Sequence, residues 1–139
     1  MDGRKVKPGL LFRSGELHDF SPEEINILEK MNLAAIIDLR AHREISERPD
    51  KPVGTVKEVI HLGIHDAARD QAVKFLEDND AEGLENILTG DYIRMVRKHQ
   101  PEFRRFLEIL ANTDNLPLVY HCAAGKDRTG LATVFLLAA

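Results

Sequence analysis

The run of seven residues at positions 33–39, Leu-Ala-Ala-Ile-Ile-Asp-Leu, constrains the fold more than any other stretch of this sequence. It is almost wholly apolar, partly β-branched and too short for a buried helix, so it predicts an interior strand. A helix that extends to about Met31 is predicted before it, because Ser21, Pro22 and Glu24 match a capping box with proline at the first helical position. A helix that leads into a buried strand indicates an α/β fold.

Further segments extend this pattern along the chain. Residues 41–48 are charged and predict a short helix that ends at the prolines that follow, and residues 56–62 alternate well enough for a second strand. Residues 118–120 predict a third strand, and the apolar residues after Gly130 are compatible with a final helix.

The stretch between the second and third strands, residues 70–113, has a helical pattern. Breaks are expected at residues 78–83, near 89–90 and at 100–101, where glycine, proline and polar residues interrupt it. The last helix of the stretch is amphipathic, and its inward face carries apolar residues at positions i, i+3, i+4 and i+7, namely Phe103, Phe106, Leu107 and Leu110.

Composition limits the classes of protein to which this chain can belong. A length of 139 residues fits one globular domain, residues 1–139, and a single cysteine excludes an intrachain disulfide and any multi-cysteine metal site. The net charge of −4 argues against a general nucleic-acid or anionic-membrane surface, so neither partner is expected. No apolar run reaches the length of a membrane span, and a cytoplasmic protein is the default expectation.

Residues 121–130, His-Cys-Ala-Ala-Gly-Lys-Asp-Arg-Thr-Gly, lie between the third predicted strand and the final predicted helix. A loop in that position directs successive backbone N–H groups and the positive end of the helix dipole toward one small volume, which suits a phosphate dianion. The small residues after Cys122 do not obstruct that approach, and Arg128 can fork two donors onto two phosphate oxygens. The same positive field favours a thiolate nucleophile at Cys122.

Two other interpretations of this loop are weaker. A lone cysteine is most often a small buried residue of the core, but packing does not explain why Arg128 and Thr129 follow Cys122 beside a core strand. A Walker-type phosphate loop would need glycine at Tyr120 and serine or threonine at Asp127, so that motif fails.

The segment resembles the Cys-x5-Arg signature loop of the cysteine-dependent protein-tyrosine phosphatase superfamily. Its Gly-Lys-Asp-Arg-Thr-Gly form is similar to the bacterial tyrosine and phosphoinositide phosphatases that are grouped with atypical dual-specificity enzymes. Upstream, residues 12–15 (Phe-Arg-Ser-Gly), the capped helix and residues 37–40 (Ile-Asp-Leu-Arg) are similar to the amino-terminal part of that family. The resemblance covers most of the chain and implies a three-layer phosphatase-type fold, with a central sheet flanked by helices.

The resemblance also implies roles for residues of the loop. Cys122 would attack phosphorus to form a phosphocysteine, and Thr129 would hydrogen-bond the thiolate as it departs in the second step. His121 would support the loop rather than relay protons. The competing structural interpretations are a core histidine for His121 and a simple helix cap for Thr129. The residues implied in phosphate binding are Ala123, Ala124, Gly125, Lys126, Asp127 and Arg128.

The general acid has three candidates, two of which can be ranked. In the resembled bacterial group the aspartate inside the loop protonates the leaving oxygen, and that position is Asp127 here. The competing interpretation of Asp127 is an ion pair that orients a basic side chain. A carboxyl group beside a bound dianion is repelled unless it turns away or is protonated, and a protonated carboxyl is what an acid catalyst needs. In dual-specificity relatives the acid lies on a separate loop after an earlier strand, where Asp66 or Asp70 could serve, and we rank Asp66 second. Lys126 offers either recognition of a second phosphate, as on an inositol ring, or a solvated surface charge.

No metal site and no cofactor are expected. Residues 78–83 imitate the start of an EF-hand loop, but Thr89 stands at the twelfth position, where a bidentate glutamate is required. His61 and His65 flank a strand end and are not aligned as a pair of metal ligands. Ion pairs that support the sheet edge and the loop are expected from Arg13, Asp38 and Arg40.

The expected reaction is metal-free hydrolysis of phosphomonoesters, with a phosphorylated protein or a phosphoinositide as substrate and inorganic phosphate or a similar oxyanion in the loop. The alternative is a non-catalytic module that binds a phosphorylated ligand. Arsenate reductases also carry Cys-x5-Arg loops, but they need resolving thiols besides Cys122. Because residues 133–139 end within an apolar helical pattern, we expect C-terminal helices of the domain to be missing, or a second chain to cover this helix.

Overall fold

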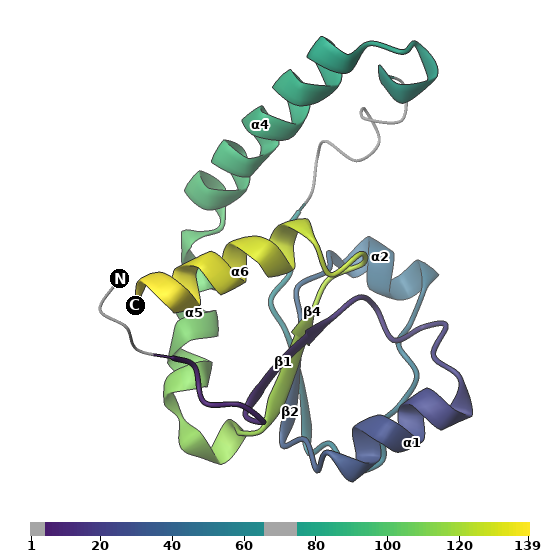
Figure 1. Cartoon of the computed structure of the whole chain (residues 1–139), viewed down its shortest axis with the longest axis vertical. Helices are drawn as coiled ribbons and strands as arrows, with labels where there is room; N and C mark the ends of the chain where they lie inside the picture. Colours follow the sequence, from purple (N-terminus) through teal and green to yellow (C-terminus); the bar gives the residue numbers. More distant parts are fainter. Residues whose placement is uncertain (1–4, 66–74) are drawn as a thin grey trace.

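This computed structural model describes residues 5–65 and 75–139, except for the side chain of residue 88. Four short parallel strands form the centre of the described part (Figure 1). The strands are β1 (Leu11–Ser14), β2 (Ala35–Asp38), β3 (Glu58–His61) and β4 (Leu118–His121). Their order across the sheet is β1-β4-β2-β3. Asp38 of β2 pairs in register with His121 of β4, so the two central strands end at the same edge.

Helices connect these strands and cover the sheet. In chain order, the helical elements include α1 (Pro22–Lys30), α2 (His42–Glu47), α4 (Ala81–Lys98), α5 (Gln100–Ala111), the 3₁₀ turn η1 (Thr113–Asn115) and α6 (Asp127–Ala138). Figure 1 shows α1 on one side of the sheet, α5 and α6 on the other, and α4 extending away from the sheet.

The two central strands are buried along their whole length, and their alternate residues face opposite layers. Ile36 belongs to a core cluster that includes Leu28 of α1. Ile37 belongs to a second cluster, which includes Phe106 of α5 and Ala132 of α6. Strands that are buried on both faces need helices on both sides, and the predicted three-layer α/β fold is confirmed.

Several local predictions are also confirmed. The Ser21 hydroxyl accepts from the Glu24 N–H at 3.2 Å, and the Glu24 carboxylate accepts from the Ser21 N–H at 2.7 Å, which completes the capping box of α1. The predicted short helix and the second and third strands are present with slightly different boundaries. On α5, Phe103 and Phe106 are buried, and Leu107 and Leu110 pack partly buried against the same cluster.

Three local predictions were wrong or incomplete. β1 was not predicted. The break expected near residues 89–90 is absent, and α4 continues through it. The reason is that a single internal glycine, Gly90, costs a helix only about 1 kcal/mol. The final helix begins at Asp127 rather than after Gly130, since the Gly130 N–H already donates to the Lys126 carbonyl at 2.8 Å.

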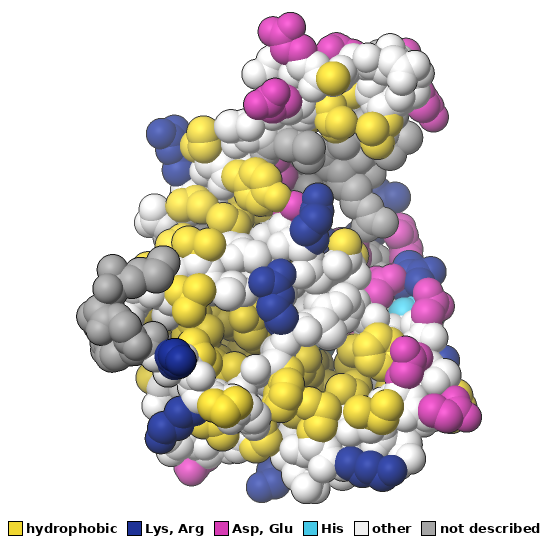
Figure 2. Space-filling view, viewed as in Figure 1, with side chains coloured by type: hydrophobic (Ala, Val, Ile, Leu, Met, Phe, Trp, Pro, Cys, Tyr) yellow, Lys and Arg dark blue, Asp and Glu magenta, His cyan; other side chains and the backbone are white. Residues whose placement is uncertain are grey.

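The surface of the molecule is uneven in character. Figure 2 shows acidic side chains around the end of α4 farthest from the sheet, and apolar side chains over much of the rest of this face. On α6, Val134 is 60% exposed and Leu137 is 66% exposed, whereas Phe135 packs 4.7 Å from Phe103, measured between ring centroids. That a further segment or a second chain covers α6 stays a prediction.

Among the described helices, none combines the length and the apolar character needed to cross a bilayer.

Candidate active site

The loop of residues 122–126 lies at the carboxyl end of β4, between that strand and α6. Ligands of parallel α/β sheets bind at this edge, because strand ends and helix N-termini converge there. Cys122 follows the strand directly and is 2% exposed, and Arg128 in the first turn of α6 is also 2% exposed. The thiol and the guanidinium therefore both lie at the predicted edge of the sheet, between a strand end and a helix start.

The backbone of the loop turns at Gly125, whose φ of +66° lies in the left-handed region. A Cβ atom at this position would lie 2.5 Å from the carbonyl oxygen of Ser14, at the end of β1. The Glu16 N–H donates to the Ala123 carbonyl at 3.0 Å, which joins the β1–α1 connection to the loop a second time. Both the backbone angle and the close approach of β1 therefore require glycine at position 125.

Arg13 of β1 also supports the loop. Its guanidinium donates to the Gly125 carbonyl at 2.7 Å and to Thr133 Oγ1 of α6 at 3.3 Å. Among the described residues, Arg13 acts through these hydrogen bonds and not through the ion pairs expected of it, because β1 places it beside the loop backbone and not beside a carboxylate.

The sulfur of Cys122 has a hydrogen-bond donor in the first turn of α6. Thr129 is fully buried, and its Oγ1 donates to Cys122 Sγ at 3.1 Å. The positive end of the α6 dipole lies at the same loop. A hydroxyl donor and a helix N-terminus are both suited to negative charge on sulfur.

The Arg128 guanidinium is held by a carboxylate from another part of the chain. Arg128 Nη1 donates to Glu44 Oε2 at 2.6 Å and Nη2 donates to Oε1 at 2.8 Å, a bidentate pair. Nη1 also lies 3.3 Å from the Ile64 carbonyl oxygen. Glu44 itself is fixed at the start of α2, where its Oε2 accepts from the Ala41 N–H at 2.9 Å.

Asp127, the first-ranked acid, is the first residue of α6. Its Oδ1 accepts a short hydrogen bond from the hydroxyl of Tyr92 on α4 and lies 3.4 Å from Lys126 Nζ. The Asp127 side chain is 24% exposed, so it is accessible from solvent but held on one side. Asp66, the second-ranked acid, lies outside the described residues, as does Asp70.

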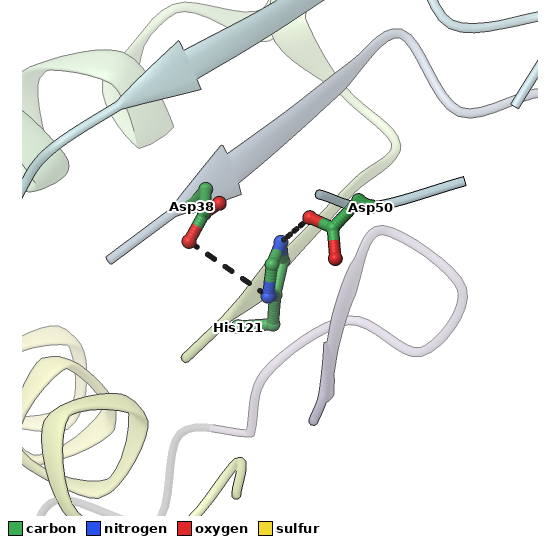
Figure 3. A group of neighbouring side chains, drawn as sticks. All are labelled: Asp38, Asp50 and His121. Carbon is green, nitrogen blue, oxygen red and sulfur yellow. Dashed lines mark ion pairs between the residues drawn. The ribbon is translucent and has the colours of Figure 1, made fainter. Parts of the chain in front are cut away.

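His121 lies between two carboxylates at the base of the loop (Figure 3). Its Nε2 lies 3.2 Å from Asp50 Oδ2, and its Nδ1 lies 4.0 Å from Asp38 Oδ1. Nδ1 is also 3.3 Å from the Cys122 carbonyl oxygen. His121 is fully buried. Its contacts with Asp38 and Asp50 connect the end of β4 to these two acidic residues.

A buried cation balances those carboxylates. Arg40 Nη2 lies 2.8 Å from Asp38 Oδ2 and 2.7 Å from Asp50 Oδ2, and Nη1 lies 3.0 Å from Glu16 Oε2. Asp38, Asp50 and His121 offer ligand atoms within 4.8 Å of one another, a spacing that also occurs in metal sites. Arg40 already contacts both aspartates, so the cluster is an ion-pair network, and the ion pairs predicted for Asp38 and Arg40 are confirmed.

The network shifts the titration of two of its members. Burial on its own would lower the pKa of Arg40, but the surrounding carboxylates, Asp38 above all, raise it. Burial would raise the pKa of Asp50, but the nearby imidazole of His121, the Leu17 N–H and the Arg40 charge together lower it. Leu17 N–H donates to Asp50 Oδ1 at 2.7 Å. Asp50 is thus stabilised as an anion beneath the loop.

The whole sequence matches one family of known proteins. The family model described as "Tyrosine phosphatase family" matches residues 1–139. The chain belongs to the tyrosine phosphatase family. The family resemblance of the loop is thereby confirmed.

The chain is similar to two bacterial proteins that are named as phosphatases. It is 28% identical over 158 residues to the "Triple specificity protein phosphatase PtpB" of Mycobacterium tuberculosis, an alignment that covers 96% of this chain and 56% of the relative. It is 24% identical over 132 residues to the "Tyrosine-protein phosphatase" of Nostoc commune, which covers 90% of this chain and 41% of the relative. The chain spans about half the length of the curated relatives it matches.

The contacts that Glu44 and Tyr92 make in this tyrosine phosphatase family member were not predicted. Glu44 stands three positions into the short helix, where a capping glutamate is common, and that is the one local signal for it. Its contact with Arg128 spans 84 positions of sequence, and the contact between Tyr92 and Asp127 spans 35. No spacing rule within a single sequence indicates contacts over such separations.

Proposed function

We propose that this chain hydrolyses phosphomonoesters through a phosphocysteine intermediate. The observation that supports this most strongly is the hydrogen bond from Thr129 to the Cys122 sulfur, in a loop that leads into Arg128. A buried cysteine with a hydroxyl donor, followed by a buried guanidinium at a helix N-terminus, is suited to attack on a phosphate ester.

The proposed reaction has two steps. In the first, the Cys122 thiolate attacks phosphorus, the S–P bond forms, and the bond from phosphorus to the leaving oxygen breaks. The leaving oxygen takes a proton from the Asp127 carboxyl group. In the second, a water molecule attacks phosphorus and gives a proton to Asp127, while the Cys122 sulfur leaves as a thiolate that Thr129 hydrogen-bonds. Ester and water become alcohol and phosphate, and the starting state is restored.

Recognition of the phosphoryl group falls to the loop backbone and to Arg128. The amide groups of residues 123–128 and the guanidinium would bind the equatorial oxygens as charge redistributes. Glu44 holds the guanidinium through Nη1 and Nη2, which fixes the direction in which it can donate. His121 and the ion-pair network would keep the base of the loop in place.

We propose phosphorylated proteins as the first substrate class and phosphoinositides as the second. The Lys126 side chain, on the last residue of the loop, is 72% exposed, where it is suited to contact a further phosphate group. The relative from Mycobacterium tuberculosis is named a triple specificity protein phosphatase, which supports testing more than one class of phosphoester.

The experiment compares steady-state hydrolysis of a phosphotyrosine peptide and of phosphoinositides by the unmodified chain, Cys122→Ser and Asp127→Asn. Cys122→Ser is expected to lose turnover while it still binds inorganic phosphate. Asp127→Asn is expected to lose about 10²-fold in kcat/KM, a typical contribution of one general acid.

Each variant tests a separate part of the mechanism. Turnover that survives in Cys122→Ser would contradict the phosphocysteine route. An Asp127→Asn protein with unchanged rate and pH profile would remove Asp127 as the acid and leave Asp66 as the candidate. Phosphate binding without any turnover by the unmodified chain would favour the alternative, a non-catalytic module for phosphorylated ligands.

A further inference from the structure

Among the described residues outside the loop, Tyr92 of α4 is the one whose side chain hydrogen-bonds the proposed acid, Asp127. We propose that Tyr92 is a positioning residue, which orients the Asp127 carboxyl group for proton transfer to the leaving oxygen. This inference rests on the proposed function and adds to it a named residue from a distant helix.

Among the described residues, the polar side-chain contacts of Asp127 fall on one of its two oxygens. The Tyr92 hydroxyl donates to Oδ1, and Lys126 Nζ lies 3.4 Å from the same atom. A carboxylic acid whose carbonyl oxygen accepts hydrogen bonds carries its proton on the other oxygen. The Tyr92 hydrogen bond and the nearby Lys126 charge, both at Oδ1, therefore assign the transferable proton to Oδ2.

Asp127 needs such a partner because its backbone alone does not fix its carboxyl group. Rotation about the last side-chain bond of an aspartate is broad and nearly two-fold, so an unrestrained carboxyl group exchanges its two oxygens. Once the proton has been transferred, the phosphoryl group on Cys122 would repel the ionised carboxylate and turn it away from the reacting atoms. A hydroxyl donor at Oδ1 opposes both movements.

Helix α4 can act as a fixed support at this point. Much of the helix is exposed, but Asp91 is 2% exposed and Met95 is 3% exposed, and they flank Tyr92 along the chain. Asp91 also accepts from Arg94 at 2.7 Å. The part of α4 that carries Tyr92 is therefore anchored to the body of the molecule, and the hydroxyl is presented to the loop from a defined position.

The proton balance of the proposed step is simple. The proton on Asp127 Oδ2 passes to the leaving oxygen as the bond from phosphorus to that oxygen breaks. Tyr92 keeps its own proton throughout and donates to Oδ1 both before and after the transfer. Removal of the hydroxyl therefore leaves the acid present but less well oriented, which reduces the rate without abolishing it.

The test uses Tyr92→Phe, which removes only the hydroxyl, and a series of aryl phosphates with leaving groups of different basicity. The kinetic constant kcat/KM reports the step in which the leaving oxygen departs. For phenyl phosphate, which needs protonation, we expect kcat/KM to fall by about 10-fold. For 2,4-dinitrophenyl phosphate, which leaves without a proton, we expect a change of less than about 2-fold. The inhibition constant for inorganic phosphate is expected to stay unchanged.

Tyr120→Phe is the matched control, since Tyr92 and Tyr120 are the two tyrosines of the sequence. The Tyr120 hydroxyl lies 2.8 Å from Thr133 Oγ1 and does not contact Asp127. Any effect of Tyr120→Phe is expected to be the same for all leaving groups. In the Asp127→Asn background, Tyr92→Phe is expected to add no further loss, because the two changes remove one function.

The possible outcomes separate this inference from the proposed function. A loss in Tyr92→Phe that is equal for all leaving groups, no loss at all, or a variant that does not fold would each overturn the positioning role. Turnover that persists in Cys122→Ser would overturn the proposed function itself. A leaving-group-dependent loss, together with an inactive Cys122→Ser, supports both.

Discussion

Substitution of Glu44 by glutamine tests whether the distant carboxylate holds the Arg128 guanidinium in place. The Arg128 side chain is 3% exposed and that of Glu44 is 18% exposed, and their bidentate contact joins α2 to α6 across the site. Glutamine has the same shape and keeps one acceptor, so the change removes the charge and one of the hydrogen bonds rather than the packing.

The magnitude follows from the burial of the pair. Removal of one partner from a buried ion pair costs about 3–5 kcal/mol, because the other charge is left in a medium of low polarity. Glutamine retains one acceptor and Glu44 is partly exposed, so we expect a loss of about 2–3 kcal/mol in the free energy of unfolding.

Glu47→Gln on the same helix is the control. Glu47 lies 2.8 Å from Arg43, but both side chains are more than half exposed, and a surface pair of this kind contributes less than about 0.5 kcal/mol. Urea unfolding at pH 7, followed by circular dichroism, gives both values. We also expect weaker inhibition by inorganic phosphate in Glu44→Gln alone. If the two variants unfold with equal free energies, the carboxylate does not hold the guanidinium and the reasoning is refuted.

Two further predictions concern the loop and its base. Gly125→Ala is expected to lose about 3 kcal/mol of stability, because the added Cβ would lie 2.5 Å from the Ser14 carbonyl oxygen at a φ of +66°. Gly130→Ala is the control, because no atom lies within 4 Å of its added Cβ. Equal thermal midpoints for the two variants would contradict the close approach at Gly125. Because the folded protein lowers the pKa of Asp50, this group stabilises the fold above about pH 4, the pKa of an unfolded aspartate, and the contribution disappears as the pH falls through the lowered value. The unfolding free energy of the unmodified chain should therefore decrease more steeply than that of Asp50→Asn below pH 4, and parallel curves from acid titrations would contradict this.

The sequence predicts those parts of the fold that depend on short-range patterns. The capping box at Ser21 and the apolar run that contains Ile36 and Ile37 each indicate one structure, because the local preference and the tertiary packing agree. β1 was missed because it is a short edge strand whose central residue, Arg13, is charged and exposed. The false break near Gly90 arose because a single glycine lowers helix propensity but does not end a helix of 18 residues.

The residues of the candidate site also fall into a part that the sequence predicts and a part that it does not. Cys122, Arg128 and Thr129 lie within one short segment, so the spacing alone brings them to one strand end and one helix start. The partners that orient them come from α2 and α4, and their contacts depend on how the helices pack around the sheet. Only a three-dimensional structure places Glu44 against Arg128 and Tyr92 against Asp127.

The most direct test of the central claim is detection of a covalent phosphoryl group on Cys122. The chain is mixed with a phosphotyrosine peptide, quenched in acid within the first turnover and digested for mass spectrometry. We predict one phosphoryl group on the peptide that contains Cys122, more of it in Thr129→Ala, whose second step is slowed, and none in Cys122→Ser. Turnover without that modification, or a phosphoryl group on another residue, would contradict the proposed mechanism.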